Sequence, residues 1–364
     1  MGVRKGKMMR ILMFGMSSYP GGIENYIANY FLSEAFSRGV TIDFVTHEGE
    51  LAYSDKIREY GHTVRVVPHF KRAPLSYMRA IDTLLQENEY DCVYLNMLSA
   101  ANILPIRCAV RRGVGKIVAH AHANSTVKGF LRKFLHKVNK RYCKKHATHK
   151  FACSKAAGEW LFDSEPCTVI PNAIDLSRFA FCDESRREIR ERHGIADGAF
   201  VMGHVGRFAE EKNHGFLIDV FKACADRAPN AVLLLVGDGG HRAAIEERVR
   251  SFGLGERVVF AGTSAETEKY YSALDCFVFP STFEGFGMAA LEAQAAGLPC
   301  FCSDCLSGEL RVTDSLLFLP LEAGADAWAD SILAEKTNHE RSVADFPATF
   351  DIAEQRKKLL EMLR

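Results

Sequence analysis

The sequence predicts an α/β protein built from two doubly wound domains, and three observations carry that prediction. The chain has 364 residues, which is enough for two domains of ordinary size. Thirteen short apolar segments alternate with segments of helical pattern over most of the chain. Strands separated by helices indicate parallel sheets with crossover helices. Hydrophobic residues make up 48% and charged residues 25%, which are ordinary values for a soluble protein with a sizeable core.

The predicted strands fall into two series. The first is RILMFG, TIDFVTH, TVRVVP, DCVYLN, KIVAHAH, HKFACS and CTVIPN, and the second is FVMGHVGR, AVLLLVGDG, RVVFAG, DCFVFPS, LPCFCS and LLFLP. The alternation breaks at residues 170–179, which we interpret as the interdomain connection. We therefore expect domains over 1–172 and 173–347, and a C-terminal helix over 348–364 that returns to the first domain. Ligands of open parallel sheets bind at the carboxyl ends of the strands, which predicts a site in the cleft between two facing domains.

Membrane spans, leader peptides and disulfides are not expected. No apolar run approaches the roughly 18 residues of a spanning helix. The basic N-terminus precedes a short apolar stretch without a small-residue cleavage site, so we interpret that stretch as the first strand. Eleven scattered cysteines favour a reduced cytoplasm. Cys300, Cys302 and Cys305 lack a fourth zinc ligand nearby, and the first two alternate along an apolar strand.

One region is strongly basic although the net charge is only +1. Between Asp91 and Glu159 there are 14 Lys and Arg and no acidic residue. Residues 128–150 carry a stripe at helical spacing, made of Phe130, Phe134, Val138 and Tyr142 and widened by Leu131 and Leu135. This pattern predicts an amphipathic basic helix at an anionic membrane surface. Alternatively, the apolar stripe packs on the sheet and the charges are solvated.

Gly21 and Gly22 follow the first strand in the segment SSYPGGIEN. Two glycines permit a tight turn and leave backbone amides open at a helix start, where an anion can bind. The alternative is a simple turn between strand and helix. The pattern departs from GxGxxG, so no nicotinamide or flavin cofactor is expected.

Arg207 and Lys212 lie in GRFAEEKNH, before a helix that should begin near Asn213. Two cations next to a helix N-terminus would neutralise a diphosphate. The alternative is a solvated charged loop, because Glu210 and Glu211 are adjacent.

Glu284 and Glu292 stand eight positions apart in STFEGFGMAALEAQAAGLPC. Gly285 and Gly287 would expose amides at a helix start near Phe286, suited to phosphate. Burying Glu292 in this alanine-rich stretch would be costly without a partner, and the two hydroxyls of a ribose would satisfy it. The alternative is a surface glutamate on a half-exposed helix.

His120 and His122 end the predicted strand KIVAHAH. A strand that runs into a loop often loses its facial alternation, so at least one of them should face the cleft. The alternative for either is an interior histidine with its hydrogen bonds satisfied.

Together these motifs resemble the retaining GT-B glycosyltransferases, a large family that includes bacterial capsule, exopolysaccharide and lipopolysaccharide transferases. The resemblance runs from GGIEN through VIPNAID, GRFAEEKNH, LVGDGG and FEGFGMAALEAQAAGLP to FDIAEQRKKLLEML. It implies the GT-B fold, in which two Rossmann-like doubly wound domains face each other across a cleft.

The resemblance implies a role for each motif of the second domain. Arg207 and Lys212 would bind the donor diphosphate and stabilise the leaving nucleotide. Glu284 would contact the donor sugar near the reaction centre, and Glu292 would hold the nucleotide ribose. The backbone amides of this motif would bind the sugar hydroxyls and phosphate, and they belong to Gly285, Phe286 and Gly287.

In the first domain the resemblance assigns Gly22, next to Gly21, to the loop that approaches the phosphates. His122 best matches the histidine that hydrogen-bonds the donor sugar, and His120 is its rival. The implied catalytic residues are then His122, Glu284, Arg207 and Lys212.

The implied activity is retaining transfer of a sugar from a nucleotide-diphosphate sugar to a glycan or lipid-linked acceptor in cell-surface polysaccharide biosynthesis. UDP is favoured by its frequency in the family. We expect same-face attack in which the departing phosphate takes the acceptor's proton. No cofactor is expected, and no metal, because no Asp-x-Asp stands at a strand end. The place of action would be the cytoplasm, at the inner face of the cell membrane.

Two other functions remain open at this point. A sugar-nucleotide epimerase of the same fold would need acid–base carboxylates in the cleft, and the motifs offer none. A non-catalytic sugar-binding protein would need a secretory signal and no diphosphate cations. Nucleic-acid binding is not expected, because one basic helix without a known module is weak support.

Overall fold

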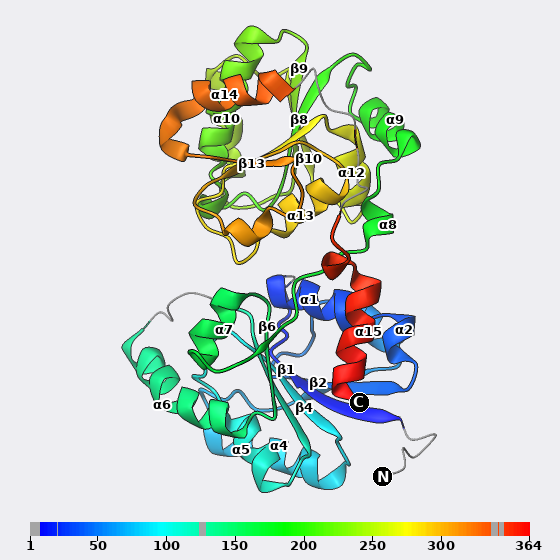
Figure 1. Cartoon of the computed structure of the whole chain (residues 1–364), viewed down its shortest axis with the longest axis vertical. Helices are drawn as coiled ribbons and strands as arrows, with labels where there is room; N and C mark the ends of the chain where they lie inside the picture. Colours follow the sequence, from blue (N-terminus) through cyan, green and yellow to red (C-terminus); the bar gives the residue numbers. More distant parts are fainter. Residues whose placement is uncertain (1–7, 20, 124–128, 336–340, 342–345) are drawn as a thin grey trace. The chain divides into compact units, whose positions relative to one another are not determined.

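The computed structural model describes residues 8–19, 21–123, 129–335, 341 and 346–364. The chain forms two compact units, one of residues 1–174 with 349–364 and one of residues 175–348. Each of the thirteen segments expected to be strands contains a strand (Figure 1). The prediction of two doubly wound α/β domains is confirmed.

The amino-terminal unit is built on a seven-stranded parallel sheet in the order β3-β2-β1-β4-β5-β6-β7. The strands are β1 (Met9–Phe14), β2 (Val40–Thr46), β3 (Thr63–Val66), β4 (Cys92–Met97), β5 (Lys116–Ala121), β6 (His149–Ala152) and β7 (Thr168–Val169). Its helices are α1 (Gly22–Phe31), α2 (Glu34–Ser37), α3 (Ser54–Glu59), α4 (Pro74–Glu87), α5 (Leu104–Arg111), α6 (Phe130–His146), α7 (Lys155–Phe162) and α15 (Ile352–Leu363).

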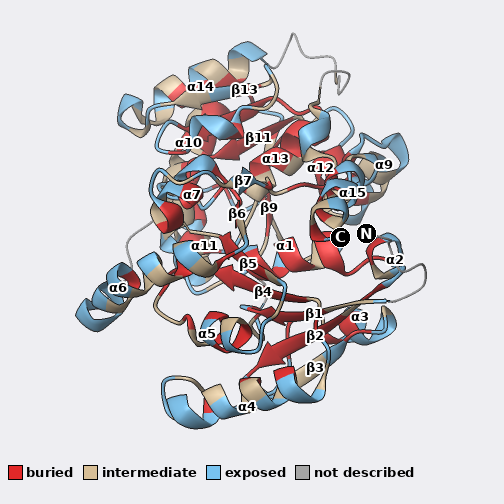
Figure 2. Ribbon diagram, turned by 60° about the horizontal axis from the view of Figure 1, so that its bottom comes forward, coloured by how far each residue is buried: buried red, intermediate tan, exposed pale blue. Residues whose placement is uncertain are grey.

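Helices cover both faces of this sheet because successive strand residues point to opposite sides. Ile11 belongs to a core cluster that includes residues of α1, α3 and α15. The next residue, Leu12, belongs to a second cluster that includes residues of α4, α5 and α7. Figure 2 shows the central strands as buried ribbons beneath helices whose outer surfaces are exposed. Buried strands of this kind are nearly continuous apolar runs, which is why the sequence revealed them.

The last helix, α15, belongs to the amino-terminal unit. It packs against α1 and α2 (Figure 1). It buries Ile352, Leu359 and Leu363. Ile174 N donates to Phe350 O and Ile352 N donates to Ile174 O, so the two connections between the units are paired here.

The carboxyl-terminal unit has a six-stranded parallel sheet in the order β10-β9-β8-β11-β12-β13. The strands are β8 (Phe200–Val205), β9 (Ala231–Val236), β10 (Val258–Gly262), β11 (Cys276–Phe279), β12 (Cys300–Ser303) and β13 (Leu316–Leu319). The helices are α8 (Leu176–Phe179), α9 (Asp183–Arg192), α10 (His214–Arg227), α11 (Arg242–Ser251), α12 (Thr267–Ala273), α13 (Met288–Ala295) and α14 (Gly324–Glu335). Short 3₁₀ turns cover Glu210–Lys212, Gly308–Leu310 and Leu321–Ala323, and another, Ala348–Phe350, lies where the chain returns to the amino-terminal unit.

The motifs predicted from sequence fall at the carboxyl ends of their strands. In the amino-terminal unit they follow β1 and β5, and in the carboxyl-terminal unit they follow β8 and β11. Each is therefore presented at the ligand-binding edge of its own sheet.

Gly15 ends β1 and allows its loop to approach β4 closely. Its φ is +103°, and a Cβ placed there would overlap the carbonyl oxygen of Asn96.

Gly113 is a matched control, because it has a φ of +67° but open space around its Cβ position. We expect Gly113→Ala to lower the free energy of unfolding by about 1–2 kcal/mol, the cost of a left-handed alanine. Gly15→Ala should lose about 2 kcal/mol more, since backbone must also move. Equal losses in urea unfolding of the two variants would contradict the close approach.

Candidate functional site

An ion pair joins the two motif loops of the carboxyl-terminal unit. Lys212 Nζ lies 2.5 Å from Glu284 Oε1, and the two side chains are only 16% and 14% exposed. The same ammonium lies 4.9 Å from the ring centroid of Phe279, the last residue of β11. Thr282 N also donates to Glu211 O at 2.9 Å. The loop after β8 and the loop after β11 therefore form one surface that carries one cation and one carboxylate at its centre.

Arg207 lies at the rim of this surface. Its side chain is 72% exposed, and its guanidinium lies 3.1 Å from Glu211 Oε1. The alternative of a solvated charged loop thus describes Arg207 in part, but not Lys212, whose amine is held against Glu284 and Phe279.

The helix after β11 begins at Met288, two residues later than Phe286, where we expected it. The reason is Gly287, whose φ of +94° places it in the left-handed region before the first helical turn. Phe286 is buried, and a Cβ at Gly287 would press on Leu310 and Phe279. Gly285 has open space around it, so a ligand can approach its backbone.

Glu292 lies in the second turn of α13 and is half-buried. Tyr271 Oη, from α12, donates to Glu292 Oε2 at 2.8 Å. Burial raises the pKa of Glu292 to about 7, against the opposing effects of the Tyr271 hydrogen bond and the Arg178 charge. A fully solvated surface glutamate does not fit this environment. The carboxyl accepts one hydrogen bond from the protein and has capacity for more.

The loop around Gly21 and Gly22 differs from a simple anion cradle. Ser17 N donates to Glu24 Oε1 at 2.9 Å, and Ser18 N donates to Glu48 Oε2 at 2.9 Å. Two amides of the segment SSYPGGIEN, ahead of the glycines, are therefore already bonded to carboxylates. The amides left for an anion are those of the first turn of α1, where no side chain caps the helix.

The two histidines of β5 have different environments. His120 is fully buried, and its Nδ1 is 2.7 Å from Tyr94 Oη. His122 follows the strand, is half-buried, and has its Nε2 2.9 Å from Asn96 Oδ1. His120 is thus an interior histidine, and His122 is the one that reaches the carboxyl edge of the sheet.

Asn96 is a site residue that the sequence did not reveal. Its Nδ2 donates to Phe14 O at 3.0 Å, which turns its Oδ1 toward His122. This network assigns the proton of His122 to Nε2 and leaves Nδ1 as an acceptor. Burial lowers the pKa of His122 to about 3, so the ring is neutral at pH 7. The signal available in the sequence was an asparagine near the end of DCVYLNM, beside the strand that carries His122.

Tyr271 was missed for a similar reason, since it lies 21 positions before the glutamate that it contacts. Its phenol is fully buried on α12. Sequence spacing gave no indication that this hydroxyl would meet α13.

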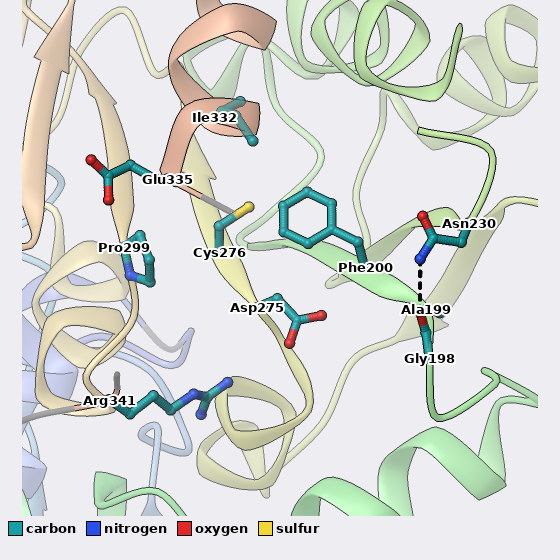
Figure 3. Close-up of a pocket in the computed structure, with 10 residues that line it drawn as sticks. All are labelled: Gly198, Ala199, Phe200, Asn230, Asp275, Cys276, Pro299, Ile332, Glu335 and Arg341. Atoms are coloured by element: carbon teal, nitrogen blue, oxygen red, sulfur yellow. Dashed lines mark hydrogen bonds between the residues drawn. The ribbon is translucent and has the colours of Figure 1, made fainter. Parts of the chain in front are cut away.

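A cavity of about 250 Å³ lies at the opposite, amino-terminal edge of the same sheet (Figure 3). It is lined by Gly198, Ala199, Phe200, Asn230, Asp275, Cys276, Pro299, Ile332, Glu335 and Arg341. Asp275, the carboxylate at its floor, accepts hydrogen bonds from Arg186 at 2.7 Å and from Arg190 at 2.8 Å. These arginines also bond backbone carbonyls at the end of α12, which is a structural arrangement rather than a reactive one.

The cysteine cluster gives no metal site within the described residues, where no group of three potential ligands converges. Cys300 and Cys302 are buried on β12, and Cys305 is exposed. In the described part of the chain, no helix is both long enough and apolar enough to cross a bilayer.

Comparison with known proteins identifies the family. The model for glycosyl transferases group 1 matches residues 185–332, and the model for glycosyltransferase family 4 matches residues 20–178. A protein assigned as the glycosyltransferase EpsF of Bacillus subtilis (strain 168) is 31% identical over 323 residues, covering 86% of this chain and 84% of the relative. The chain therefore belongs to the glycosyl transferases group 1, as the motifs predicted.

Two further proteins show the extent of the likeness. The UDP-Gal:alpha-D-GlcNAc-diphosphoundecaprenol alpha-1,3-galactosyltransferase of Escherichia coli is 29% identical over 234 residues, covering 61% of this chain and 59% of that one. The crystal structure of Anabaena Alr3699/HepE in complex with UDP aligns with a TM-score of 0.80 at 20% identity, covering 98% of this chain and 99% of the other. This likeness confirms the GT-B fold.

The hydrogen bond between Asn96 and His122 can be tested through the histidine. In Asn96→Asp a carboxylate replaces the amide, and an opposite charge favours protonated imidazole. We expect the pKa of His122 to rise from about 3 by at least one unit, measured by NMR titration. Asn96→Leu is the control, because it removes the hydrogen bond without adding charge and should leave the pKa low. An unchanged pKa in Asn96→Asp would contradict the assigned contact.

Proposed function

We propose that this glycosyltransferase moves a sugar, with retention of configuration, from a nucleotide-diphosphate sugar to a glycan or lipid-linked acceptor of a cell-surface polysaccharide or glycolipid. The observation that carries the proposal is the constellation of Lys212, Glu284 and Glu292 at one sheet edge. UDP is the favoured nucleotide, supported by the UDP complex of the HepE structure. The diphosphoundecaprenol acceptor named for the Escherichia coli relative supports a lipid-linked acceptor.

The donor diphosphate binds at Arg207 and Lys212 in this proposal. Arg207 is exposed and can swing from Glu211 to the phosphate, whereas Lys212 must exchange part of its contact with Glu284. Fixed cations in a partly buried site stabilise the charge that develops on a departing diphosphate. We expect them to serve without a divalent metal, so that chelation leaves turnover unchanged.

Glu292 holds the ribose. Two ribose hydroxyls donate to the carboxylate beside the hydrogen bond from Tyr271 Oη. Hydrogen bonds to the charged form stabilise it, so the nucleotide should lower the pKa of Glu292 below its free value of about 7.

Glu284 and the amides of Gly285–Gly287 face the transferred sugar. The family resemblance assigns to His122 a hydrogen bond with that sugar, which its neutral ring can make. The acceptor hydroxyl attacks the anomeric carbon on the face from which the diphosphate leaves. The hydroxyl proton passes to the departing phosphate oxygen, so the chain needs no second carboxylate as nucleophile or base.

We infer that α6 is the membrane-binding element. Its outward face carries four exposed apolar side chains. They are Phe130 (88% exposed), Leu131 (68%), Phe134 (55%) and Val138 (54%). The neighbouring exposed residues are basic and comprise Arg132, Lys133, Lys137, Arg141 and Lys145. The expected alternative, in which the apolar stripe packs on the sheet, does not describe these four residues, although Leu135 and Tyr142 are half-buried. Figure 2 shows the exposed face of α6.

Not every lysine of the helix faces outward. Lys140 and Lys144 lie 2.7 and 2.8 Å from the carboxylate oxygens of Asp163, and Lys144 also contacts Glu165 at 3.2 Å. The charges of these two lysines are therefore compensated within the chain. The helix itself covers residues 130–146, and Lys128 lies outside the described residues.

Glu292 should contribute mainly to nucleotide affinity, and Glu284 mainly to turnover. We expect Glu292→Gln to weaken the binding of free nucleoside diphosphate by about 10- to 100-fold, because the variant loses charged hydrogen bonds to the ribose. Glu284→Gln should still bind nucleotide, because Lys212 remains to meet the diphosphate, but lose on the order of 10²-fold in turnover. Calorimetry and initial rates separate the effects, with Glu210→Gln, an exposed neighbour, as control. Equal loss of nucleotide affinity in both variants would contradict this division.

The pH dependence of nucleotide binding supplies a second test of Glu292. The free carboxyl has a raised pKa, so at pH 6 it is mostly protonated and must ionise to bind ribose in the proposed way. Affinity should therefore rise by up to about tenfold from pH 6 to pH 8. The Glu292→Gln variant corrects for titration of the phosphate itself. A wild-type profile parallel to that of the variant would refute the ribose contact.

The membrane proposal has a matched pair of variants. Neutralising the outward residues in Lys133→Gln/Lys137→Gln/Arg141→Gln should weaken binding to phosphatidylglycerol vesicles about 100-fold at low salt, at about 1 kcal/mol per charge. Neutralising the paired residues in Lys140→Gln/Lys144→Gln should leave vesicle binding nearly unchanged. Co-sedimentation measures both. Wild-type protein that never sediments with anionic vesicles, or equal losses in the two variants, would contradict the inference.

A further inference from the structure

A cluster of basic side chains lies at the carboxyl ends of β2 and β3, outside the residues assigned so far. His47 follows β2, and His69, Lys71 and Arg72 occupy the turn after β3. The rings of His47 and His69 meet edge to face, with centroids 4.2 Å apart. We call these four residues the β2–β3 basic cluster.

The turn after β3 is fixed by its own backbone. Arg72 N and Ala73 N both donate to His69 O, at 3.1 and 2.9 Å. His69 stacks on Phe70, and the Lys71 ammonium lies 5.8 Å from the centroid of the same ring. The cationic groups are therefore presented by an ordered turn and not by a free loop.

The cluster has more positive than negative charge. Its facing carboxylate is Glu48, whose Oε1 lies 3.8 Å from His47 Nε2 and whose Oε2 already accepts from Ser18 N. Among the described residues, neither Lys71 nor Arg72 forms an ion pair with a carboxylate. Exposed arginine and lysine side chains next to histidine donors suit a phosphate group.

His69 offers a donor to such a group. Lys71 N donates to His69 Nδ1 at 3.0 Å, so the ring proton is on Nε2. Burial lowers the pKa of His69, and the charges of His47, Arg72 and Lys71 lower it further. A bound anion would offset the neighbouring cations and raise that pKa.

The sheet order places the cluster relative to the other residues of this edge. From β2 to β5 there are three strand spacings, across β1 and β4. At about 4.8 Å each, the ends of β2 and β5 lie about 14 Å apart. His122 follows β5, so a group bound at the cluster is farther from it than the width of one sugar ring. Ser18, in the loop after β1, contacts Glu48 and connects the two regions.

We propose that the β2–β3 basic cluster binds the phosphate or diphosphate group of the acceptor. This assignment rests on the proposed function, in which the acceptor is lipid-linked or a glycan, and it adds an anionic anchor to that acceptor. The length of the edge fits a molecule whose reacting hydroxyl and phosphate are separated by at least one sugar. The phosphate can belong to a lipid diphosphate or to a soluble sugar phosphate, because the recognising chemistry is shared.

The experiment uses the full chain with Lys212→Ala, which weakens the other phosphate site. Inorganic pyrophosphate is titrated by calorimetry at low salt. We expect saturable binding that Lys71→Gln/Arg72→Gln weakens at least tenfold. Lys56→Gln/Arg58→Gln on α3, which are also exposed and remove the same formal charge, should leave it unchanged. Pyrophosphate should also raise the pKa of His69 in NMR titrations, a readout that a purely structural role would not move.

Either of two results overturns the proposal. One is pyrophosphate binding that Lys71→Gln/Arg72→Gln leaves intact, and the other is equal weakening by the two double variants, which would mean unspecific charge attraction. The double variants are checked by thermal unfolding, and loss of the His69 response in a folded Lys71→Gln/Arg72→Gln protein supports the site.

Two further ligands, farnesyl diphosphate and glucose 1-phosphate, distinguish the source of the phosphate. Binding of farnesyl diphosphate through the same residues indicates a lipid diphosphate, whereas binding of pyrophosphate and glucose 1-phosphate with exclusion of farnesyl diphosphate indicates a soluble acceptor. Binding of a nucleoside diphosphate by the wild-type chain, in which Lys212 is intact, is measured separately and tests the proposed function. If it fails while the cluster binds pyrophosphate, the proposed function is refuted and the anion site stands.

Discussion

The ion pair between Lys212 and Glu284 is the contact on which the arrangement of the carboxyl-terminal site depends. It joins the 3₁₀ turn after β8 to the loop after β11, and both side chains are largely buried. Such a pair is sensitive to the loss of either partner, because the remaining charge would be left in a poorly solvated place. A ligand that offers Lys212 a phosphate and Glu284 a hydroxyl replaces the pair without leaving either charge alone. We therefore expect the pairing to hold the two loops together until such a ligand binds.

Burial sets the charge of the groups around that pair. His204 and His214 are buried behind the loop that carries Lys212, and burial lowers both pKa values, that of His214 to about 4. Burial has the opposite effect on the carboxyl of Glu292, whose pKa it raises to about 7. At neutral pH the histidines add no positive charge, and Glu292 is only partly ionised. The charges of Lys212, Glu284, Arg207 and Glu211 then dominate the local field, which suits a ligand with a diphosphate and many hydroxyls.

The sequence was sufficient for the strands and for the positions of the motifs, because buried parallel strands are continuous apolar runs and ligand sites lie at their ends. It was insufficient where partners are distant in the chain. Asn96 and His122, Tyr271 and Glu292, and Lys140 with Asp163 meet only through tertiary packing. The start of α13 was misplaced by two residues, since a glycine motif does not reveal which glycine adopts the left-handed conformation. The carboxylates of Glu24 and Glu48 on the loop amides were likewise hidden, although Glu24 is part of the GGIEN motif.

We propose that the edge of the carboxyl-terminal sheet formed by the loops after β8 and β11 binds a nucleoside diphosphate. Titration calorimetry of the full chain with UDP, GDP and ADP tests it most directly, because it requires neither the donor sugar nor the acceptor. We expect saturable one-to-one binding of one of them, with UDP favoured, and a marked loss of affinity in Lys212→Ala. Absence of binding by all three nucleotides, or binding that Lys212→Ala leaves unchanged, would contradict it.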